Sequence, residues 1–445
     1  MRATVSLPAG RKLSVSALGF FRSQGLPGFG TRQTRFTTLE VGRAITSVAY
    51  DSSSDLGPTS KLHLHFYYSF EQQRFRDAFS EISILPTLTR DRSDSFGSNF
   101  HFSRRLAWFV RLAGVVELRY EQIAPRDAFK TPPQAPIATR LFVGTGAEVD
   151  FWWARLRLHV IPSLRLEVSR DARIDVARNG AVTADSAALL QALPLGRLAF
   201  VEEATAWLTL RANVARYERL PSSSELYGNS GFLLGNTKLE PEAGYNADLG
   251  GTIRLRKSWF AVVVEPTLFA SFVDNLIQFQ EVANGRARAL NLGRARVLGV
   301  ELALQLEMTR FARLLAQATF TDARDVSDTS IGRLGPQLPL RPRFHLYARP
   351  EVHNLRLGKQ ITAGAYLEFD FTDEDYVDPA NFAKLPARFL LGAGVYADAL
   401  QRRLQVIASA QNLTDARVFD VAGFPLPSRA FFVSLRVKTE KEKEQ

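Results

Sequence analysis

His63 and His65 lie two residues apart in the segment Lys61–Phe70 (KLHLHFYYSF), a spacing that could serve metal chemistry. Alternate residues of a strand point to one face, so the two imidazoles could share a transition metal. The chain has no cysteine, and no carboxylate in this segment shares their face. The alternative is that the histidines are polar side chains on a solvated face, and we predict no metal site and no cofactor.

Enzyme motifs are absent from the sequence. It has no G-x-S-x-G, no H-E-x-x-H and no phosphate-binding loop of the G-x-x-x-x-G-K-[ST] type. A Ser/His pair brought together only by the fold would leave no such motif. We therefore predict a protein that is not an enzyme.

The excess of positive charge does not have the distribution expected of a nucleic-acid interface. The formal net charge is +11, but arginines such as Arg155, Arg157, Arg165, Arg254 and Arg256 are spread singly over many segments. A nucleic-acid interface would cluster them on one stripe. We predict no nucleic-acid partner, and we expect the charged tail, residues 438–445, to be solvated.

The polar side chains discussed above must be positioned by strands, and Val297–Met308 (VLGVELALQLEM) shows the strand pattern most clearly. Leu298, Val300, Leu302 and their alternate neighbours are apolar, while Glu301 and the other residues between them include carboxylates and an amide. This period of two predicts a strand with one apolar and one polar face, of about the length that a tilted strand needs to cross a bilayer. Hydrophobic residues make up 46% of the chain, and no apolar run reaches the length of about 18 residues that a membrane helix requires.

The same alternation recurs along the chain. It is seen in Lys61–Phe70, Arg155–Val160, Thr205–Asn213, Leu404–Gln411 and Phe431–Val437, with a first strand near Ala3–Pro8 and another at Lys12–Phe21. A short helix competes only over Ala181–Ala192. Towards the C-terminus we predict strands at 242–256, 259–272, 297–308, 313–322, 341–352, 359–371, 386–398, 403–412 and 429–437.

The connections between these predicted strands alternate in length. Lys257–Ser258, Thr309–Ala312, His353–Gly358 and Ala399–Arg402 are short, whereas Val273–Arg296, Asp322–Leu340, Thr372–Leu385 and Leu413–Ser428 are long. A soluble sandwich has no reason to sort its loops in this way. An antiparallel transmembrane β-barrel does, with turns in the periplasm and loops outside, and the count is about 19 strands.

Three blocks carry a family resemblance. Arg219-Leu220-Pro221-Ser222 with Glu225-Leu226-Tyr227, followed by Gly235-Asn236-Thr237-Lys238-Leu239-Glu240-Pro241-Glu242, resembles a passage of TonB-dependent outer-membrane receptors. Asn291-Leu292-Gly293 with Gly299-Val300-Glu301, and Leu338-Pro339 to Pro342, are similar to later passages of that family. Asn412-Leu413-Thr414-Asp415, then Gly423-Phe424-Pro425 and Ser428-Arg429, resembles its C-terminal ending.

The resemblance implies a 22-stranded barrel in the outer membrane of a Gram-negative bacterium, closed by a plug. Such receptors take up a ferric siderophore, cobalamin or an oligosaccharide with energy relayed by TonB. We expect residues 1–437 to form the barrel of such a receptor, as a monomer in outer-membrane lipid, with the plug, signal peptide and first strands not included in this sequence. Residues 438–445 would be a charged tail. The alternative function is a passive pore or a structural barrel, since a barrel of this size without a plug leaves an aqueous lumen.

Candidate ligand contacts lie in the expected outer loops, because aromatic and cationic side chains suit an anionic or aromatic chelate. They are Phe232, Arg286, Arg288, Arg333, Tyr376, Phe382, Phe419 and Phe424. The alternative is that the loop aromatics pack against their own loops. Arg211 and Glu301 face the interior on the predicted parity, and we expect ion pairing there. For the residues of the three blocks we expect structural roles, with Gly235 and Asn236 at positive φ and Asn412 and Asp415 bonding their own backbone.

Overall fold

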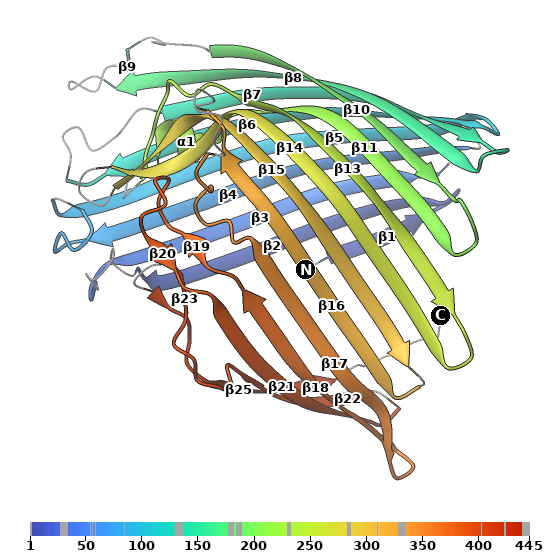
Figure 1. Ribbon diagram of the computed structural model, residues 1–445. Coiled ribbons are helices and arrows are strands. Elements are labelled where there is room, and N and C mark those ends of the chain that lie inside the picture. Colours follow the sequence, from blue (N-terminus) through green and yellow to red (C-terminus); the bar gives the residue numbers. More distant parts are fainter. Residues whose placement is uncertain are drawn as a thin grey trace. The chain divides into compact units, whose positions relative to one another are not determined.

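The structure is a computed structural model in which strands dominate. It describes residues 2–26, 34–53, 55, 57, 59–83, 85–129, 137–176, 182–183, 189–228, 233–282, 286–308, 310–327, 335–401, 403–421 and 424–437. In that part of the chain 21 strands belong to one sheet, and the single helix, α1, is the five-residue Ser223–Tyr227. The prediction of an all-β, antiparallel fold is confirmed (Figure 1).

The strands have the following bounds in chain order. They are β1 Arg2–Leu7, β2 Arg11–Gly25, β3 Thr38–Ser52, β4 Ser60–Asp77, β5 Thr87–Ala107, β6 Val110–Asp127, β7 Ile137–Trp153, β8 Leu158–Val176, β9 Val182–Thr183, β10 Leu189–Glu202, β11 Leu208–Arg219, β12 Leu233–Leu234, β13 Glu242–Arg256, β14 Phe260–Val282, β15 Arg286–Met308, β16 Ala312–Asp325, β17 Phe344–Leu357, β18 Ile361–Thr372, β19 Asp375–Tyr376, β20 Lys384–Leu385, β21 Arg388–Ala399, β22 Leu404–Gln411, β23 Phe419–Val421, β24 Phe424–Pro425 and β25 Ala430–Val437.

The chain divides into two compact units. Unit 1 comprises Met1–Phe200, Asn213–Asn246 and Val273–Arg294, and unit 2 comprises Val201–Ala212, Ala247–Phe272 and Ala295–Gln445. The predicted charged tail, residues 438–445, lies outside the described residues.

In unit 1 the strands β1 to β8 pair antiparallel with their sequence neighbours (Figure 1). The alternation predicted from Lys61–Phe70 is present in β4, where Phe66 is 56% exposed and His65 and Tyr67 are on the opposite face. Phe66 pairs with Val48 of β3 and Ser98 of β5. An exposed apolar face on a sheet whose other face is polar is what a bilayer-spanning strand requires.

In unit 2 the segment Val297–Met308 pairs with β16 as its sequence pattern predicts. Val300 faces Phe320, and Leu306 faces Leu314, while Glu301 faces Thr319. At these positions apolar residues meet apolar residues and a polar residue meets a polar one, whereas Leu298 faces Asp322 and Gln305 faces Leu315. Strands β16, β17, β18, β21, β22 and β25 continue this antiparallel order.

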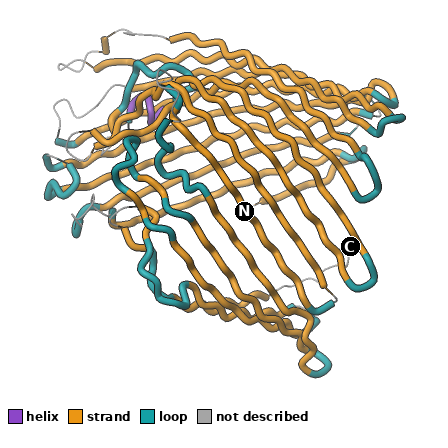
Figure 2. The backbone as a smooth tube through the Cα atoms, viewed as in Figure 1, coloured by secondary structure: helices purple, strands orange, loops and turns teal. Residues whose placement is uncertain are grey.

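Connections alternate in length within each unit. In unit 1, short connections cover 8–10, 108–109 and 154–157, and longer ones cover 26–37 and 78–86. In unit 2, short connections cover 257–259, 358–360 and 400–403, and longer ones cover 326–343, 373–387 and 412–429. Figure 2 shows that within each unit the short turns gather at one end of the strands.

Three predictions about element boundaries are wrong. The loop expected at 273–296 is instead mostly the extended β14–β15 pair, with only 283–285 between the strands. In this hairpin Ile277 and Ala289 are buried in a cluster with Leu226 of α1. Apolar and polar residues therefore no longer alternate there. The strand expected at Arg155–Val160 begins only at Leu158, because 154–157 form a tight turn with Arg157 at φ 51°. The strand expected at Thr205–Asn213 begins at Leu208 for the same reason, since Thr205 and Leu208 exchange backbone hydrogen bonds across a turn.

Tyrosine rings cover glycines on neighbouring strands. Tyr396 faces Gly364 across β18 and β21, and Tyr366 faces Gly394 in the same pair of strands. A Cβ added at either glycine would lie within 2.4 Å of the opposing ring. The missing side chain is therefore what lets each ring lie flat on the sheet.

The described part of the chain contains no helix long and apolar enough to span a membrane.

Candidate functional site

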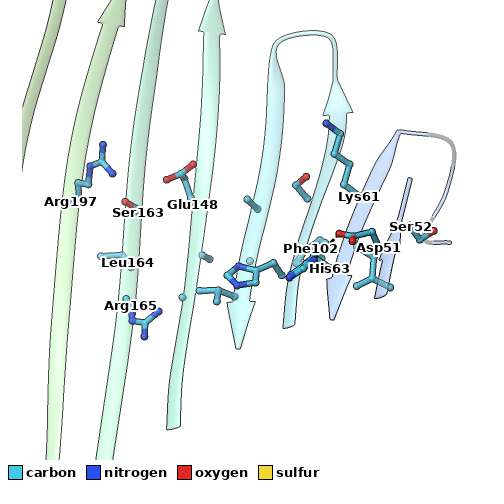
Figure 3. Close-up of a pocket in the computed structure, with 18 of the residues that line it drawn as sticks. Asp51, Ser52, Lys61, His63, Phe102, Glu148, Ser163, Leu164, Arg165 and Arg197 are labelled. Carbon is cyan, nitrogen blue, oxygen red and sulfur yellow. Dashed lines mark hydrogen bonds and ion pairs between the residues drawn. The ribbon is translucent and has the colours of Figure 1, made fainter. Parts of the chain in front are cut away.

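A large cavity lies on the polar face of unit 1. Its volume is about 1060 Å³, and it is lined by strands from β1 to β11. Six basic side chains and two carboxylates line it, namely Arg2, Lys12, Lys61, Arg165, Arg197, Arg216, Asp51 and Glu148. Figure 3 shows Lys61, Arg165 and Arg197 on separate strands around this cavity. Arg165 is paired with Glu117 and Glu167, and Arg216 with Glu218. The other four basic side chains still outnumber the two carboxylates of the lining, which favours an anionic occupant.

Of the two histidines in the first prediction, His63 lines this cavity and His65 does not. His63 makes a 2.7 Å contact from Nδ1 to Asp51 Oδ1, the residue opposite it on β3. The His63 ring centroid lies 6.1 Å from that of His65 and 6.0 Å from that of His101 on β5. No group of three or more His, Asp or Glu side chains in the described residues could hold a metal ion. Asp51 orients the His63 ring, and a solvated polar role accounts for these contacts.

A buried ion pair fixes the neighbouring strands β7 and β8 to the long connection after β11. Arg140 donates to both carboxylate oxygens of Asp171, at 2.6 and 3.2 Å, and both side chains are less than 8% exposed. The same guanidinium donates to the carbonyl of Pro221 at 2.8 Å. Pro221 belongs to the first block of the family resemblance, so this part of the block is anchored to the sheet.

The rest of that block forms a capped helix and an acidic clamp. Ser222 accepts from the backbone of Glu225, and Glu225 accepts from the backbone of Ser222, which is a capping box. Arg219 bridges Glu225 at 3.0 Å and Glu242 at 2.6 Å. Burial of Glu225 opposes its ionisation, but Arg219 and the Ser222 N–H hold the pKa of this carboxyl below its ordinary value.

Asparagines tie the second half of the block to the β14–β15 hairpin. Asn236 donates to the carbonyl of Ala289, and Asn291 donates to the carbonyls of Glu240 and Asn275. Beneath them Leu226, Leu239, Ile277 and Ala289 form a buried cluster with Tyr227 packed on it. These polar groups are bonded within the fold, as expected of structural residues.

Gly235 is structural for a different reason from the one predicted. Neither Gly235 nor Asn236 adopts the expected positive φ. A Cβ at Gly235 would lie 2.4 Å from the Tyr227 carbonyl carbon and 2.5 Å from Leu226 O. Glycine is needed because the two backbones approach closely. At the C-terminal end the prediction is confirmed for Asn412, which bonds both the N–H and the carbonyl of Ala416. Asp415 instead accepts from the N–H of Arg429, fourteen residues further along the chain.

The candidate ligand residues belong to both units, and several lie outside the described residues. Phe232 and Arg333 lie outside the described residues, as do the side chains of Arg286 and Phe424. Arg286 and Arg288 are in β15 rather than in a loop, which corrects that expectation, and Arg288 is exposed. Phe419 is half-buried in the short strand β23.

Tyr376 and Phe382 belong to one loop of unit 2, but they differ in exposure. Tyr376 is half-buried under the ammonium of Lys384, which lies 5.1 Å from its ring centroid, and Phe382 is 90% exposed. Asp378 accepts from the backbone N–H groups of Phe382 and Ala383 and so holds the loop that presents the phenyl ring. Tyr376 therefore packs within its own loop, as the alternative interpretation predicts, whereas Phe382 is free to contact a ligand.

Two of the carboxyls in the loop around these residues, Asp375 and Asp378, have opposite environments. Hydrogen bonds from the N–H groups of Ala383 and Phe382 hold the pKa of Asp378 below its ordinary value. Burial raises the pKa of Asp375, which the N–H of Tyr376 partly offsets. Asn381 ties this loop to the 326–343 connection through Gln337, accepting from its N–H and donating to its carbonyl.

Arg211 and Glu301 were expected to form ion pairs. Arg211 donates to Thr252 at 2.9 Å, and Thr252 donates in turn to Glu265. Glu301 is exposed on the polar face opposite Thr319. Pairing of either residue with a plug domain remains a prediction.

Sequence reasoning missed the cationic cavity and the α1 helix. Lys61, Arg165 and Arg197 stand on the polar parity of their strands, but nothing local indicates that they face one another. The helix had a readable signal, because Ser222 and Glu225 have the spacing of a capping box.

Comparison with known proteins agrees with this geometry. The family model described as "TonB dependent receptor-like, beta-barrel" matches residues 5–413. No curated protein matches the sequence of the chain. Among solved structures, the FrpB iron transporter from Neisseria meningitidis (F5-1 variant) is 13% identical, with a TM-score of 0.76 over 98% of this chain and 71% of that one.

Two further structures are similar. The copper transporter OprC is 16% identical, with a TM-score of 0.70 over 96% of this chain and 71% of that one. BauA, the ferric preacinetobactin receptor from Acinetobacter baumannii, is 13% identical, with a TM-score of 0.70 over 96% of this chain and 69% of that one. Identities this low show a shared fold.

Proposed function

This chain belongs to the TonB-dependent receptor-like β-barrel family, and we propose that it is the barrel of an outer-membrane receptor that takes up a scarce small ligand by TonB-energised transport. Members of this family are outer-membrane proteins of Gram-negative bacteria. The ligand would be a metal chelate such as a ferric siderophore. A plug domain and TonB would be its partners.

The observation that carries the proposal is the pairing of an apolar and a polar face in the same strands. Phe66 and Val300 are exposed on the apolar parity, whereas Lys61 and Arg165 line a cavity of about 1060 Å³ on the polar parity. A bilayer covers the first face and water or cargo occupies the second. Even with Arg165 and Arg216 paired to carboxylates outside the lining, basic groups outnumber acidic ones around the cavity, which favours an anionic ligand, as many metal chelates are.

Ligand capture would begin at the long loops. Phe382 is the candidate with the clearest geometry, because it is exposed and its loop is held by Asp378. A test measures binding of ferric chelates to the folded chain by fluorescence quenching, with Phe382→Ala against Phe79→Ala as a control. Phe79 is an exposed phenylalanine, 67% exposed, in a unit 1 loop. Weaker binding in Phe382→Ala alone supports the site, and equal binding in both variants rejects it.

A passive pore is the second candidate, favoured by the polar lining of the cavity. Planar-bilayer conductance separates the two functions. A receptor with its plug stays nearly silent, and the chain alone would conduct until a plug is supplied. Steady conductance that no plug domain suppresses would overturn the receptor proposal and favour the pore.

A further inference from the structure

A second cavity lies on the polar face of unit 2. Its volume is about 550 Å³, and it lies near the short turns after β17 and β21. Arg313, Arg349, Glu351 and His353 line it from β16 and β17, and Tyr366 and Tyr396 line it from β18 and β21. None of these residues was a candidate from the sequence.

One of the two carboxylates that line this cavity, Glu351, is already fully engaged. Glu351, whose side chain is 2% exposed, accepts from Arg313 at 2.8 Å and from the Tyr396 hydroxyl at 2.7 Å. Arg349 Nη2 lies 3.5 Å from the same carboxylate. Two guanidinium groups thus surround one buried charge, but Arg349 is shared with a second carboxylate, because its Nη1 lies 3.8 Å from Glu368 Oε1. The attraction of this cavity for an anion therefore depends on its hydrogen-bond donors rather than on an excess of positive charge.

Three nitrogens around the cavity have no hydrogen-bond partner. Arg313 Nε, Arg349 Nε and His353 Nε2 are all buried and unpaired among the described residues. Asn354 Nδ2 lies 2.7 Å from His353 Nδ1, and an amide nitrogen can only donate, so Nδ1 is the acceptor and the neutral ring carries its proton on Nε2. All three unpaired groups are therefore donors.

A buried donor without a hydrogen-bond partner lowers the stability of the fold. A ligand that supplies acceptor oxygens to the three donors around this cavity would therefore be bound favourably. The remaining acid of the lining, Asp398, already accepts from Gln405 at 2.9 Å. The Arg349 guanidinium also lies 3.8 Å from the Tyr366 ring centroid, which restricts its position. Because Tyr366 and Tyr396 in turn rest on glycines, the walls are held before any ligand arrives.

From these contacts we infer that the cavity lined by Arg313, Arg349 and His353 is a binding site for a small oxyanion of the carboxylate or phosphate class. The inference concerns binding in solution and goes beyond the proposed uptake. Absence of transport would leave it standing, and absence of anion binding would leave the receptor proposal standing.

The test is calorimetric titration of the folded, detergent-solubilised chain with citrate, with inorganic phosphate and with glycerol as a neutral probe. We expect saturable binding of citrate or phosphate and none of glycerol. The anion that binds more tightly identifies the class. No saturable heat with either anion would overturn the inference.

Two variants and one control locate the binding. His353→Leu removes a donor, and Arg349→Gln replaces a charged guanidinium by a neutral amide. Each should weaken anion binding by about tenfold or more, since a hydrogen bond to the anion is lost or loses its charge assistance. Arg356→Gln is the matched control, because Arg356 is an exposed arginine of the same strand that does not line the cavity. His353→Gln keeps an amide donor and should restore part of the affinity.

Folding of each variant is checked by circular dichroism and by the heat-dependent electrophoretic mobility of folded barrels. Unchanged affinity in folded His353→Leu, or an equal loss in Arg356→Gln, would show general attraction by the basic lumen and overturn the assignment. If Arg349→Gln does not fold, His353→Leu alone decides, because the Glu351 pair with Arg313 does not involve His353.

Discussion

Arg140 and Asp171 face each other across β7 and β8 and form a two-pronged, buried ion pair. The guanidinium has a third acceptor, the carbonyl of Pro221, so the same side chain joins the sheet to the block that precedes α1. A residue of the family-like block is thus held by strands more than forty positions away in the sequence. Stability of this region depends on that contact more than on the exposed pairs around it.

Arg140→Leu is expected to lower the free energy of unfolding by about 3–5 kcal/mol, because Asp171 is left buried and uncompensated. Urea unfolding followed by tryptophan fluorescence measures it. Arg92→Leu is the control, since the Arg92–Asp94 pair has a guanidinium side chain that is 56% exposed, and it should cost about 0–1 kcal/mol. Similar costs for the two variants would contradict the importance assigned to burial.

Ser222→Ala removes the side-chain half of the capping box. The expected cost is about 1 kcal/mol, confined to α1 and its flanks, because the Glu225 N–H loses its side-chain acceptor and keeps only the Ser222 carbonyl. Hydrogen exchange of the segment 222–228 should be about fivefold faster. Ser223→Ala, one residue on, removes neither capping bond and should leave the exchange rate unchanged; acceleration of both would point to a general loosening of the loop.

Gly299→Ala tests the close packing of the strand that first indicated the fold. A Cβ there would lie 2.2 Å from the Phe269 ring and 2.5 Å from Phe320 O, so the neighbouring ring and strand must move. We expect destabilisation of about 1–3 kcal/mol in urea unfolding. Gly19→Ala provides the comparison, because a Cβ at Gly19 meets nothing within 4 Å. An unaffected Gly299→Ala would mean that Phe269 can turn away freely.

We expect the stability of the loop that presents Phe382 to depend on pH through Asp378. Its pKa is lowered in the folded loop, so its stabilising bonds are fully present above the ordinary carboxyl value of 3.8 and are lost as the pH falls through the lower folded value. Hydrogen exchange of 378–386, corrected for intrinsic rates, should accelerate in that acidic range. Asp378→Asn should exchange faster at neutral pH and lose the acid-dependent step; the same step in the variant would assign it to another group.

Much of the fold could be read from the sequence because a strand's alternation is local. Strand β13 has the predicted bounds, 242–256, and Val297–Met308 pairs as its parity requires. The turns at 154–157 and 205–207 could not be placed, because the alternation of their residues continues through a tight turn. The loop expected at 273–296 failed where the strands bury residues under α1 and no longer alternate.

The sequence by itself determined that the chain is all-β, with one face for lipid and one for water, and that its loops alternate in length. Each of these properties depends on the order of neighbouring residues along one strand. Only the tertiary structure decided which polar side chains meet: Arg140 with Asp171, the cations around the unit 1 cavity, and the unpaired donors of Arg349 and His353. Those meetings depend on the register between strands, and register is set by the whole sheet rather than by any local spacing.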